Sequence, residues 1–576
     1  MVRLGRLRQG NAGTEPWLMA LLAAAVGVAA SAVAVALRSG VHWLFEALHT
    51  VRESPWGIAL PAVGALLGVI VIRVIFREPG GHGVPAVLEA VSRRGGSMRP
   101  RSMVSRLLGS LINVASGGSA GLEGPIAFSA AAVGSTVAAG AKVAERQRVL
   151  LLACGVAGGI GAIFNAPLTG VIFATEVVLA EWTLATVIPV VVAATVATSI
   201  GRGLLGAEGA FSSGEFAWDS VDLGLAVPLG LLAGVVSVGL VGSIFKVEML
   251  AAHLKKGRLL GKPGVVAAIA GLGVGGIGWV FPQAIGEGYE LVNECLNDDF
   301  HSELFVVVAM VLLAKFIATV LTLGSNAPGG IFAPSLVLGA ALGFSYGGAL
   351  NLLPGIEVEA GFFALLAMAG LVAGTMQAPF TGMFLALETT GSWSETLPLM
   401  LAAVLSALVS RSLLRHSFYT WELAETGRLL RPGTDRRILA DLQAVEMLDL
   451  ESVTIEVGHT LDDLAKILPK TRRNHFAVVD DDGVFQGMLD LSSLRSVIFD
   501  PLLRQMTPVD TAMDSTVPRI RDDDSLLQTM EVFEEVGAWV LPVVDGEGKF
   551  LGTLSKSTLF DRYRRELIVQ TSARAE

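Results

Sequence analysis

The chain has few cysteines and few charged residues for its length. Only Cys154 and Cys295 occur among 576 residues, so the sequence contains neither a disulfide framework nor a zinc-ligand pattern. Charged residues make up 16% of the chain and hydrophobic residues 52%, and the mean hydropathy is +0.62. This composition is too apolar for an ordinary soluble enzyme. The formal net charge of −10 gives no indication of nucleic-acid binding.

Long uncharged segments account for the high hydropathy. Trp17–Leu37 carries no charge and is long enough to cross a bilayer, so we expect it to be a retained membrane span or a buried helix. Spanning and shorter segments mixed together indicate helices that stop inside the membrane, and the 67 glycines suit close helix packing. The further uncharged runs are Gly57–Ile72, Thr183–Ile200, Leu223–Phe245, Val265–Phe281 and Leu397–Ser410.

One apolar pattern occurs twice. Asn165–Glu176 reads NAPLTGVIFATE, and Gln377–Glu388 reads QAPFTGMFLALE. The copies share Ala, Pro, Thr, Gly, a second Ala and the final Glu. A duplicated apolar segment interrupted by Pro and Gly is typical of transport proteins built from structural repeats, with the site between the halves. The sequence therefore predicts a transport protein rather than an enzyme.

The chain is expected to comprise a membrane part and a soluble part. We expect an N-terminal cytosolic tail at 1–16, a membrane domain at 17–425 and a linker at 426–439, followed by soluble repeats at 440–497 and 506–566 and a tail at 567–576. Two basic loops favour the cytoplasmic side, although an anionic-lipid patch is the alternative. Their basic residues are Arg93, Arg94, Arg99, Arg101 and Arg106, and Lys255, Lys256, Arg258 and Lys262.

The soluble part contains a repeat of its own. Phe476–Asp480 and Val540–Asp545 each read as a buried strand followed by a turn and a second strand. Amphipathic stretches, Thr460–Leu468 and Ser525–Val536, precede them, which predicts a β-α-β-β-α unit made twice. This arrangement resembles a tandem pair of CBS domains. Such pairs often bind an adenine nucleotide, but Thr558 stands where the ribose-binding Asp is expected, so nucleotide binding is doubtful and a dimerisation role is favoured.

Four Gly- or Ser-led segments in the membrane part suit an anion. Gly and Pro at a half-helix start leave backbone N–H groups free, and the helix dipole makes that end positive. Several such ends together form an anion site without Lys or Arg, which the anion can leave again. The segments are Gly81–Pro85 (GHGVP), Gly121–Pro125 (GLEGP), Gly330–Pro334 (GIFAP) and Ser417–Thr420 (SFYT).

In this order, the four segments resemble those of the CLC family of chloride channels and chloride/proton exchangers. The resemblance covers about residues 17–425 and is closest to prokaryotic members. It implies a polytopic all-α membrane fold of two inverted repeats with discontinuous half-helices, followed by a cytosolic α/β CBS pair. It also implies a homodimer in a bacterial inner membrane, with both termini cytoplasmic, bound chloride, and no required cofactor or metal.

The resemblance assigns roles to individual residues. Glu123 matches the gating glutamate, whose ionised carboxylate mimics the anion and leaves the pore when protonated. Tyr419 matches the tyrosine whose hydroxyl contacts the central anion, and Ile331 and Phe332 match the positions whose backbone N–H groups bind it. The remaining expected chloride-binding residues are His82, Gly83, Leu122 and Gly124.

Three positions, two of them among these residues, depart from the family pattern. His82 replaces a common Ser; its ring either donates a hydrogen bond to the anion or turns aside. Leu122 replaces a common basic residue, which removes positive potential near the gate. Val177 stands where exchangers carry a second acid that relays protons, so we expect a passive gated chloride channel. A chloride/proton antiporter using Glu176 is the alternative, although a role for Glu176 and its symmetry mate Glu388 at half-helix ends is favoured.

A CBS-regulated magnesium transporter is the alternative from a different class. A magnesium pore needs clustered acids to replace the water that the ion holds tightly. The acids of the membrane part are few and dispersed, and the Gly-rich half-helix starts favour an anion.

Overall fold

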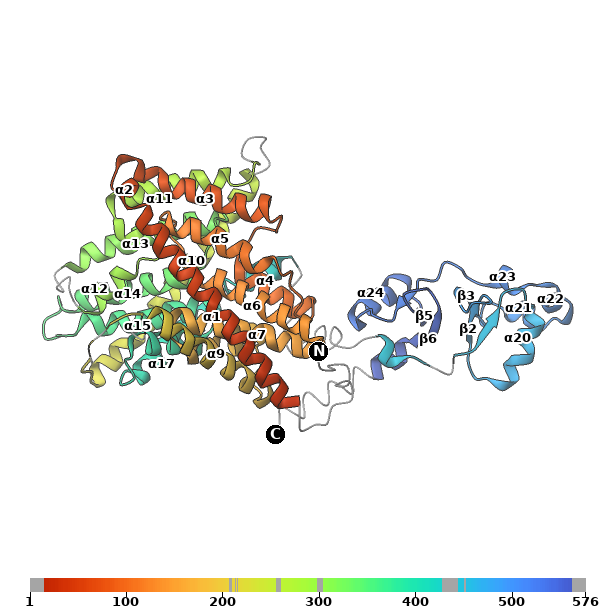
Figure 1. Ribbon diagram of the computed structural model, residues 1–576. Coiled ribbons are helices and arrows are strands. Elements are labelled where there is room, and N and C mark those ends of the chain that lie inside the picture. Colours follow the sequence, from red (N-terminus) through yellow and green to blue (C-terminus); the bar gives the residue numbers. More distant parts are fainter. Residues whose placement is uncertain are drawn as a thin grey trace. The chain divides into compact units, whose positions relative to one another are not determined.

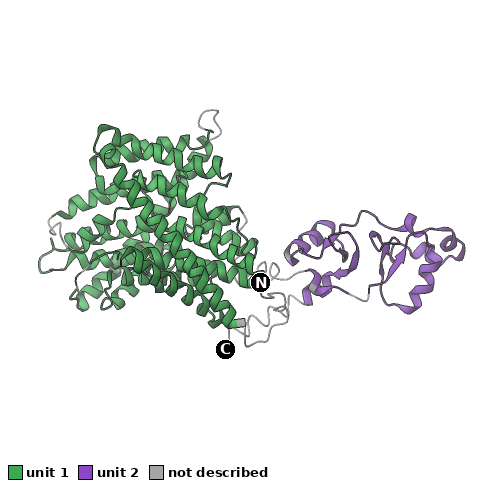
Figure 2. Ribbon diagram, viewed as in Figure 1, with its two compact units in different colours: residues 1–429 green, residues 430–576 purple. Residues whose placement is uncertain are grey.

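The computed structural model describes residues 15–206, 210–212, 214, 216–254, 261–297, 304–426, 444–449 and 452–561 (Figure 1). The chain divides into two compact units, residues 1–429 and 430–576 (Figure 2). Several expected parts lie outside the described residues: residues 1–14 of the expected tail at 1–16, the tail at 567–576, most of the linker, the start of the first soluble repeat at 440–443, and the basic residues Lys255, Lys256 and Arg258.

The first unit is helical throughout its described part. Nine of its described helices are long and apolar enough to cross a membrane, and shorter apolar helices lie between them, as the sequence predicts. The expected span Trp17–Leu37 lies within the first helix. The helices are α1 (Glu15–Ala47), α2 (His49–Arg52), α3 (Leu60–Ile70), α4 (Gly83–Arg93), α5 (Ser102–Ala115), α6 (Glu123–Ala141), α7 (Glu145–Phe164), α8 (Pro167–Phe173), α9 (Leu184–Leu205), α10 (Ser220–Leu254), α11 (Val265–Val280), α12 (Tyr289–Leu296), α13 (Phe305–Gly324), α14 (Phe332–Leu350), α15 (Ala360–Met376), α16 (Pro379–Thr390), α17 (Thr396–Leu413) and α18 (Trp421–Glu425), with short turns of other helix types at Pro55–Ala59, Val71–Ile75, Ala174–Leu179 and Pro282–Ala284.

Small residues let the central helices pack closely. Every residue of α15 is buried, and most of α7 is buried as well. A Cβ atom on Gly155 of α7 would overlap the Ala130 carbonyl oxygen of α6, and one on Gly343 of α14 would overlap the Phe363 carbonyl oxygen of α15. The backbones therefore approach one another directly at corresponding places in the two halves.

The duplicated sequence marks the same chain break in each half. Asn165 and Gln377 adopt the left-handed conformation, with φ of 58° and 55°, and terminate α7 and α15. Pro then occupies the first turn of α8 and of α16, where its missing N–H costs nothing. The repeat therefore ends one buried helix and starts the next in both halves.

The second unit contains two three-stranded sheets built alike. In the first, β1 (Thr454–Glu456) runs parallel to β2 (His475–Val479), which pairs antiparallel with β3 (Phe485–Asp490). The second repeats this order with β4 (Ile520–Arg521), β5 (Val540–Val544) and β6 (Phe550–Ser555). The predicted strands and amphipathic helices are confirmed. The helices are α20 (Leu461–Ile467), α21 (Arg495–Ile498), α22 (Pro501–Met506), α23 (Val509–Ala512) and α24 (Leu526–Val536), with short turns at Ala444–Met447 and Leu468–Lys470.

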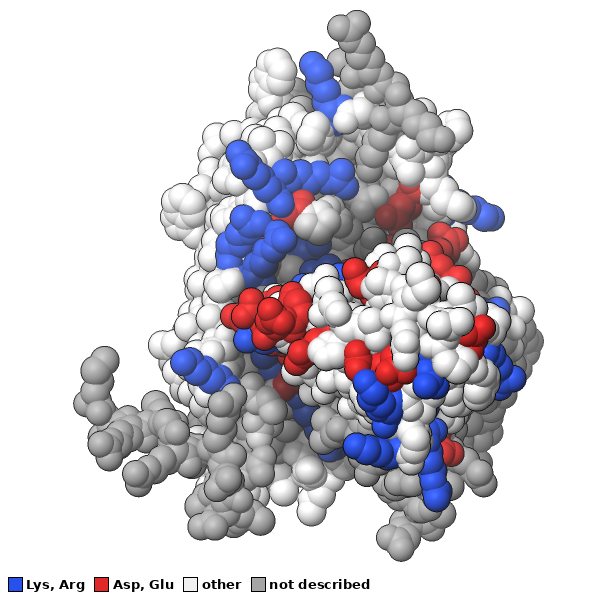
Figure 3. Space-filling view, turned by 90° about the vertical axis from the view of Figure 1, so that its right-hand side faces the viewer, with Lys and Arg blue, Asp and Glu red and all other residues white. Residues whose placement is uncertain are grey.

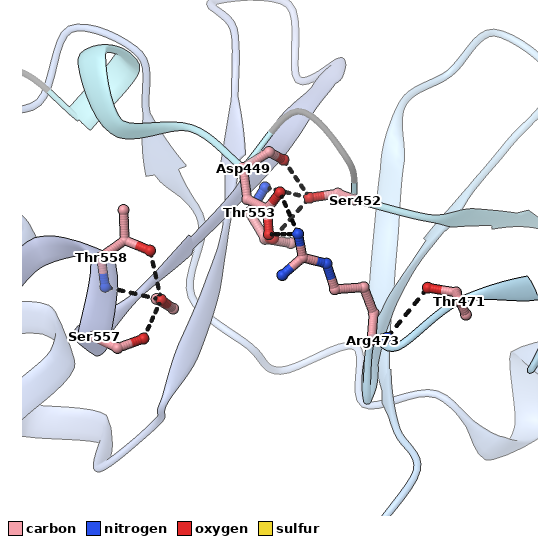
Figure 4. A network of polar contacts seen from close by, with 8 residues as sticks. Asp449, Ser452, Thr471, Arg473, Thr553, Ser557 and Thr558 are labelled. Atoms are coloured by element: carbon pink, nitrogen blue, oxygen red, sulfur yellow. Dashed lines mark hydrogen bonds and ion pairs between the residues drawn. The ribbon is translucent and has the colours of Figure 1, made fainter.

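A polar network connects the two repeats of this unit (Figure 4). The Asp449 N–H donates to the Thr553 carbonyl of β6 at 2.9 Å, and the hydroxyls of Ser452 and Thr553 lie 2.7 Å apart. Arg473, from the first repeat, forms an ion pair with Asp449 at 2.8 Å. Thr558 hydrogen-bonds within its own turn, to Ser555 at 2.9 Å. The segment before β1 is thus bonded to the last strand of the second repeat.

Candidate anion pathway

Two half-helix starts meet head to head inside the membrane unit. Leu122 occupies the N-cap position of α6, and Ile331 occupies that of α14. Just before these caps, Gly121 and Gly330 exchange two backbone hydrogen bonds of 2.8 Å each. This bridge brings the positive ends of both helices to one place, where free N–H groups can hold an anion.

The start of α4 packs against the same place. His82 caps α4, and Gly83 is its first residue. A Cβ atom on Gly83 would overlap the Gly124 carbonyl oxygen in the first turn of α6, so the two backbones touch directly. Three helix N-termini therefore converge, and all of the residues that they contribute are buried.

Aromatic rings connect the remaining predicted residues. Tyr419 is 3% exposed, and its ring centroid lies 6.1 Å from that of Phe173. Phe173 in turn contacts Phe332, the first residue of α14, at 6.0 Å. Phe418 lies between Tyr419, at 5.7 Å, and His82, at 4.7 Å. The structure thus brings Tyr419, Phe332 and His82 into one buried cluster at the helix ends.

The Glu123 carboxylate lies at the bridge between α6 and α14. Glu123 is 2% exposed, and its Oε1 accepts a 3.0 Å hydrogen bond from the Tyr289 hydroxyl. Its Oε2 has no hydrogen-bond partner among the described residues. A Cβ atom on Gly330 would lie 3.2 Å from this oxygen, and one on Gly121 would overlap it. The carboxylate therefore lies between the two helix starts, whose positive ends favour a negative charge.

Sequence analysis missed Tyr289 and its neighbours. Tyr289 starts α12, directly after Gly286, Glu287 and Gly288. Fully buried Lys315 donates from Nζ to the Gly286 carbonyl at 2.8 Å and so fixes this loop. The available signal was ionisable residues among apolar ones, because such residues inside a membrane are functional by default.

The family resemblance assigns the gate to Glu123, and on that assignment Tyr289→Phe is expected to release it. Phe retains the ring, which packs on Phe211 with centroids 5.2 Å apart, but loses the hydroxyl that holds the Glu123 carboxylate. A hydrogen bond to a charged group contributes about 1.5 kcal/mol or more, so chloride efflux from liposomes at neutral pH should rise about tenfold. Tyr346→Phe is the control, since that hydroxyl donates to the Leu225 carbonyl. Equal efflux from both variants would contradict a role for Tyr289.

The final Glu of each repeated segment binds the start of the helix that the other segment forms. Glu176 accepts from the N–H of Phe380 at 3.3 Å and from the N–H and hydroxyl of Thr381 at 2.8 and 2.7 Å. Glu388 accepts in the same way from Leu168 and Thr169. Both carboxylates are therefore engaged at helix starts. Val177 is partly buried against the apolar core, in a π-helical turn at Ala174–Leu179.

Arg106 differs from its expected position in a cytoplasmic basic loop. It lies in α5, is 5% exposed, and donates to the carbonyls of Gly81 and Pro79 just before the His82 cap. Nearby Glu78 accepts hydrogen bonds of 2.5 Å from Ser102 and Ser105. The other four arginines of this stretch are exposed. In Figure 3, several basic side chains lie together at the upper left, and basic and acidic side chains are intermingled lower on the drawn face.

Comparison with known proteins identifies the family. The family model described as voltage gated chloride channel matches residues 63–411, and a CBS domain model matches residues 509–565. A protein of Ralstonia nicotianae with the provisional name ClcB-like chloride channel protein is 32% identical over 70% of this chain and 96% of its own length. An H(+)/Cl(−) exchange transporter ClcA of Vibrio parahaemolyticus is 29% identical over 72% of this chain and 91% of its own.

Solved structures share the fold. A slow cyanobacterial Cl−/H+ antiporter superposes with a TM-score of 0.63 at 24% identity, covering 71% of this chain and 97% of its own. A eukaryotic CLC transporter superposes with a TM-score of 0.62 at 19% identity, covering 94% of this chain and 98% of its own. The residues matched by the family model, 63–411, include α4, α6 and α14. This chain is therefore a multi-pass membrane protein of the CLC family with a C-terminal CBS region.

Proposed function

We propose that the protein exchanges chloride for protons across the membrane. The observation that carries this proposal is the Glu123 carboxylate, buried between the starts of α6 and α14 with Oε2 unpartnered among the described residues. A group that both occupies an anion position and can take up a proton links the two ions. Relatives named as H(+)/Cl(−) exchange transporters favour exchange over the passive channel that Val177 suggested.

The geometry supports a simple cycle. Backbone N–H groups at the starts of α4, α6 and α14 hold chloride, with Ile331, Phe332, Gly83 and Gly124 supplying buried backbone. Ionised Glu123 competes for the same place, because its carboxylate is itself an anion. Protonation neutralises Glu123 and lets chloride replace it, so each proton bound or released accompanies chloride movement. Tyr289 then acts by holding the ionised gate.

The exchange is tested with purified protein in chloride-loaded liposomes. Chloride efflux down its gradient is expected to drive protons inward, so external pH should rise as chloride leaves. Chloride efflux and external pH are recorded together, with protein-free liposomes as control. Rapid chloride efflux without any pH change would replace the exchange proposal with the passive channel.

The assembly, the location and the roles of the domains also belong to the proposal. We infer a homodimer with one pore in each subunit, located in a bacterial inner membrane with both termini cytoplasmic. The membrane domain at 17–425 carries the transport site, and the soluble repeats at 440–497 and 506–566 form a dimerisation module. Thr558 bonds within its own turn, which supports a module that does not need a nucleotide.

A further inference from the structure

Exchange requires a proton route to Glu123, and the expected relay position is Val177, which cannot carry a proton. Glu176, the adjacent acid, is engaged by three hydrogen bonds at the start of α16. If the proposed exchange is correct, other titratable side chains close to the anion site must move the proton. The structure places two such side chains close together, one at the start of α4 and one on α18, which packs against α4.

The first is His82. It is 5% exposed, and its Nε2 is buried without a hydrogen-bond partner among the described residues. Its ring lies against Phe418, at 4.7 Å between centroids, and its chain neighbour Gly83 touches the residue after Glu123. An imidazole can accept a proton at one nitrogen and release one from the other. His82 is therefore a proton carrier positioned at the anion site.

The second is Glu422, three residues after Tyr419. A Cβ atom added to Gly81 would lie 3.4 Å from each Glu422 carboxylate oxygen, so this carboxylate faces the residue before His82. Glu422 is only partly buried, whereas His82 is buried. It belongs to α18, which packs against α4. A partly exposed acid beside a buried imidazole can exchange protons with water and pass them to the ring.

Other charges surround this pair. Arg106 of α5 acts electrostatically on both His82 and Glu422, and Glu89 of α4 and Glu248 of α10 act on Glu422. Glu78 and Arg73 act on Arg106 in turn. Glu89 is bonded to Arg94 in the exposed arginine stretch after α4. By the positive-inside tendency, Glu422 therefore lies toward the cytoplasmic side.

We propose that Glu422 and His82 carry protons between the cytoplasmic side and Glu123, in place of the acid that Val177 replaces. Glu422 takes a proton from water and transfers it to His82, which becomes an imidazolium. His82 then transfers a proton to the Glu123 carboxylate and returns to the neutral form. Bound chloride next to the ring offsets the positive charge while the imidazolium exists. This proposal rests on the proposed exchange.

The test compares the ratio of proton flux to chloride flux in liposomes. Glu422→Gln removes the acid, and this ratio should fall at least about tenfold. His82→Asn removes the titratable ring but keeps an N–H donor, and it should lower the ratio in the same way. Glu425→Gln is the matched control, since Glu425 is exposed on the same short helix and both fluxes should stay unchanged.

The possible results separate the two proposals. Wild-type liposomes that lose chloride without moving protons would overturn the exchange and this route with it. Wild-type exchange with an unchanged flux ratio in both variants would overturn the route alone. A purely structural role for Glu422 would lower both fluxes together and keep their ratio, which would also overturn the route. If Glu422→Gln fails to fold, as judged by size-exclusion chromatography, the ratio measured for His82→Asn decides.

Discussion

Glu123→Gln is expected to abolish proton transport while chloride still crosses the membrane. The glutamine side chain has the size of the protonated glutamic acid and carries no charge, so it cannot compete as an anion for the place between α6 and α14. It also cannot bind and release a proton. Proton flux in the liposome assay should fall at least about 100-fold, and chloride efflux should become independent of pH between 5 and 8.

The wild-type chain should behave differently across this pH range. In the cycle that we propose, ionised Glu123 blocks the site and protonated Glu123 leaves it, so wild-type chloride efflux should rise as the pH falls. Glu395→Gln tests whether any buried acid would have the same effect, because Glu395 is fully buried but bonds to Phe216 and Ser394 instead. Proton transport that survives in Glu123→Gln would show that another group is the gate.

Glu388→Ala is expected to cause the largest loss of stability. Glu388 accepts three hydrogen bonds, from the N–H groups of Leu168 and Thr169 and from the Thr169 hydroxyl. Alanine leaves these donors at the start of α8 without a partner and removes a negative charge from a positive helix end. Unfolding of the purified protein in detergent should become easier by about 3 kcal/mol, seen as a lower thermal midpoint.

Two variants complete this experiment. Glu176→Ala removes the symmetry-related cap of α16 and should destabilise the protein by a similar amount. Glu359→Ala is the control, because Glu359 stands directly before α15 but its side chain makes no capping bond and is exposed. Its effect should stay within about 0.5 kcal/mol. A small effect of Glu388→Ala would show that water satisfies the start of α8.

The sequence predicted the architecture because its strongest signals are local. The uncharged run Trp17–Leu37 lies within α1, and the duplicated Asn165 and Gln377 segments form the same helix break twice. The strands of the soluble repeats follow from short apolar runs and the turn residues near Asp480 and Asp545. Each of these features depends on neighbours a few positions away, which a single sequence displays directly.

The site was predicted only where a motif marks it. His82, Glu123, Phe332 and Tyr419 belong to Gly- or Ser-led segments, and the structure brings them together. Tyr289 was missed, because its partner Glu123 lies far away in the sequence and no local pattern predicts their contact. Arg106 was misplaced for a related reason, since a basic run indicates a loop unless burial against Gly81 and Pro79 is known.

The bridge between Gly121 and Gly330 limits how this molecule can work. Many transporters rock one repeat against the other around a fixed site, which alternately opens the two sides. Here the two halves are fastened to each other at the site itself by paired backbone hydrogen bonds, so rocking would have to break them on every turnover. For the exchange that we propose, the bridge therefore favours a cycle of side-chain rotations over rocking of the two halves. A covalent cross-link between the halves away from the site should leave transport running.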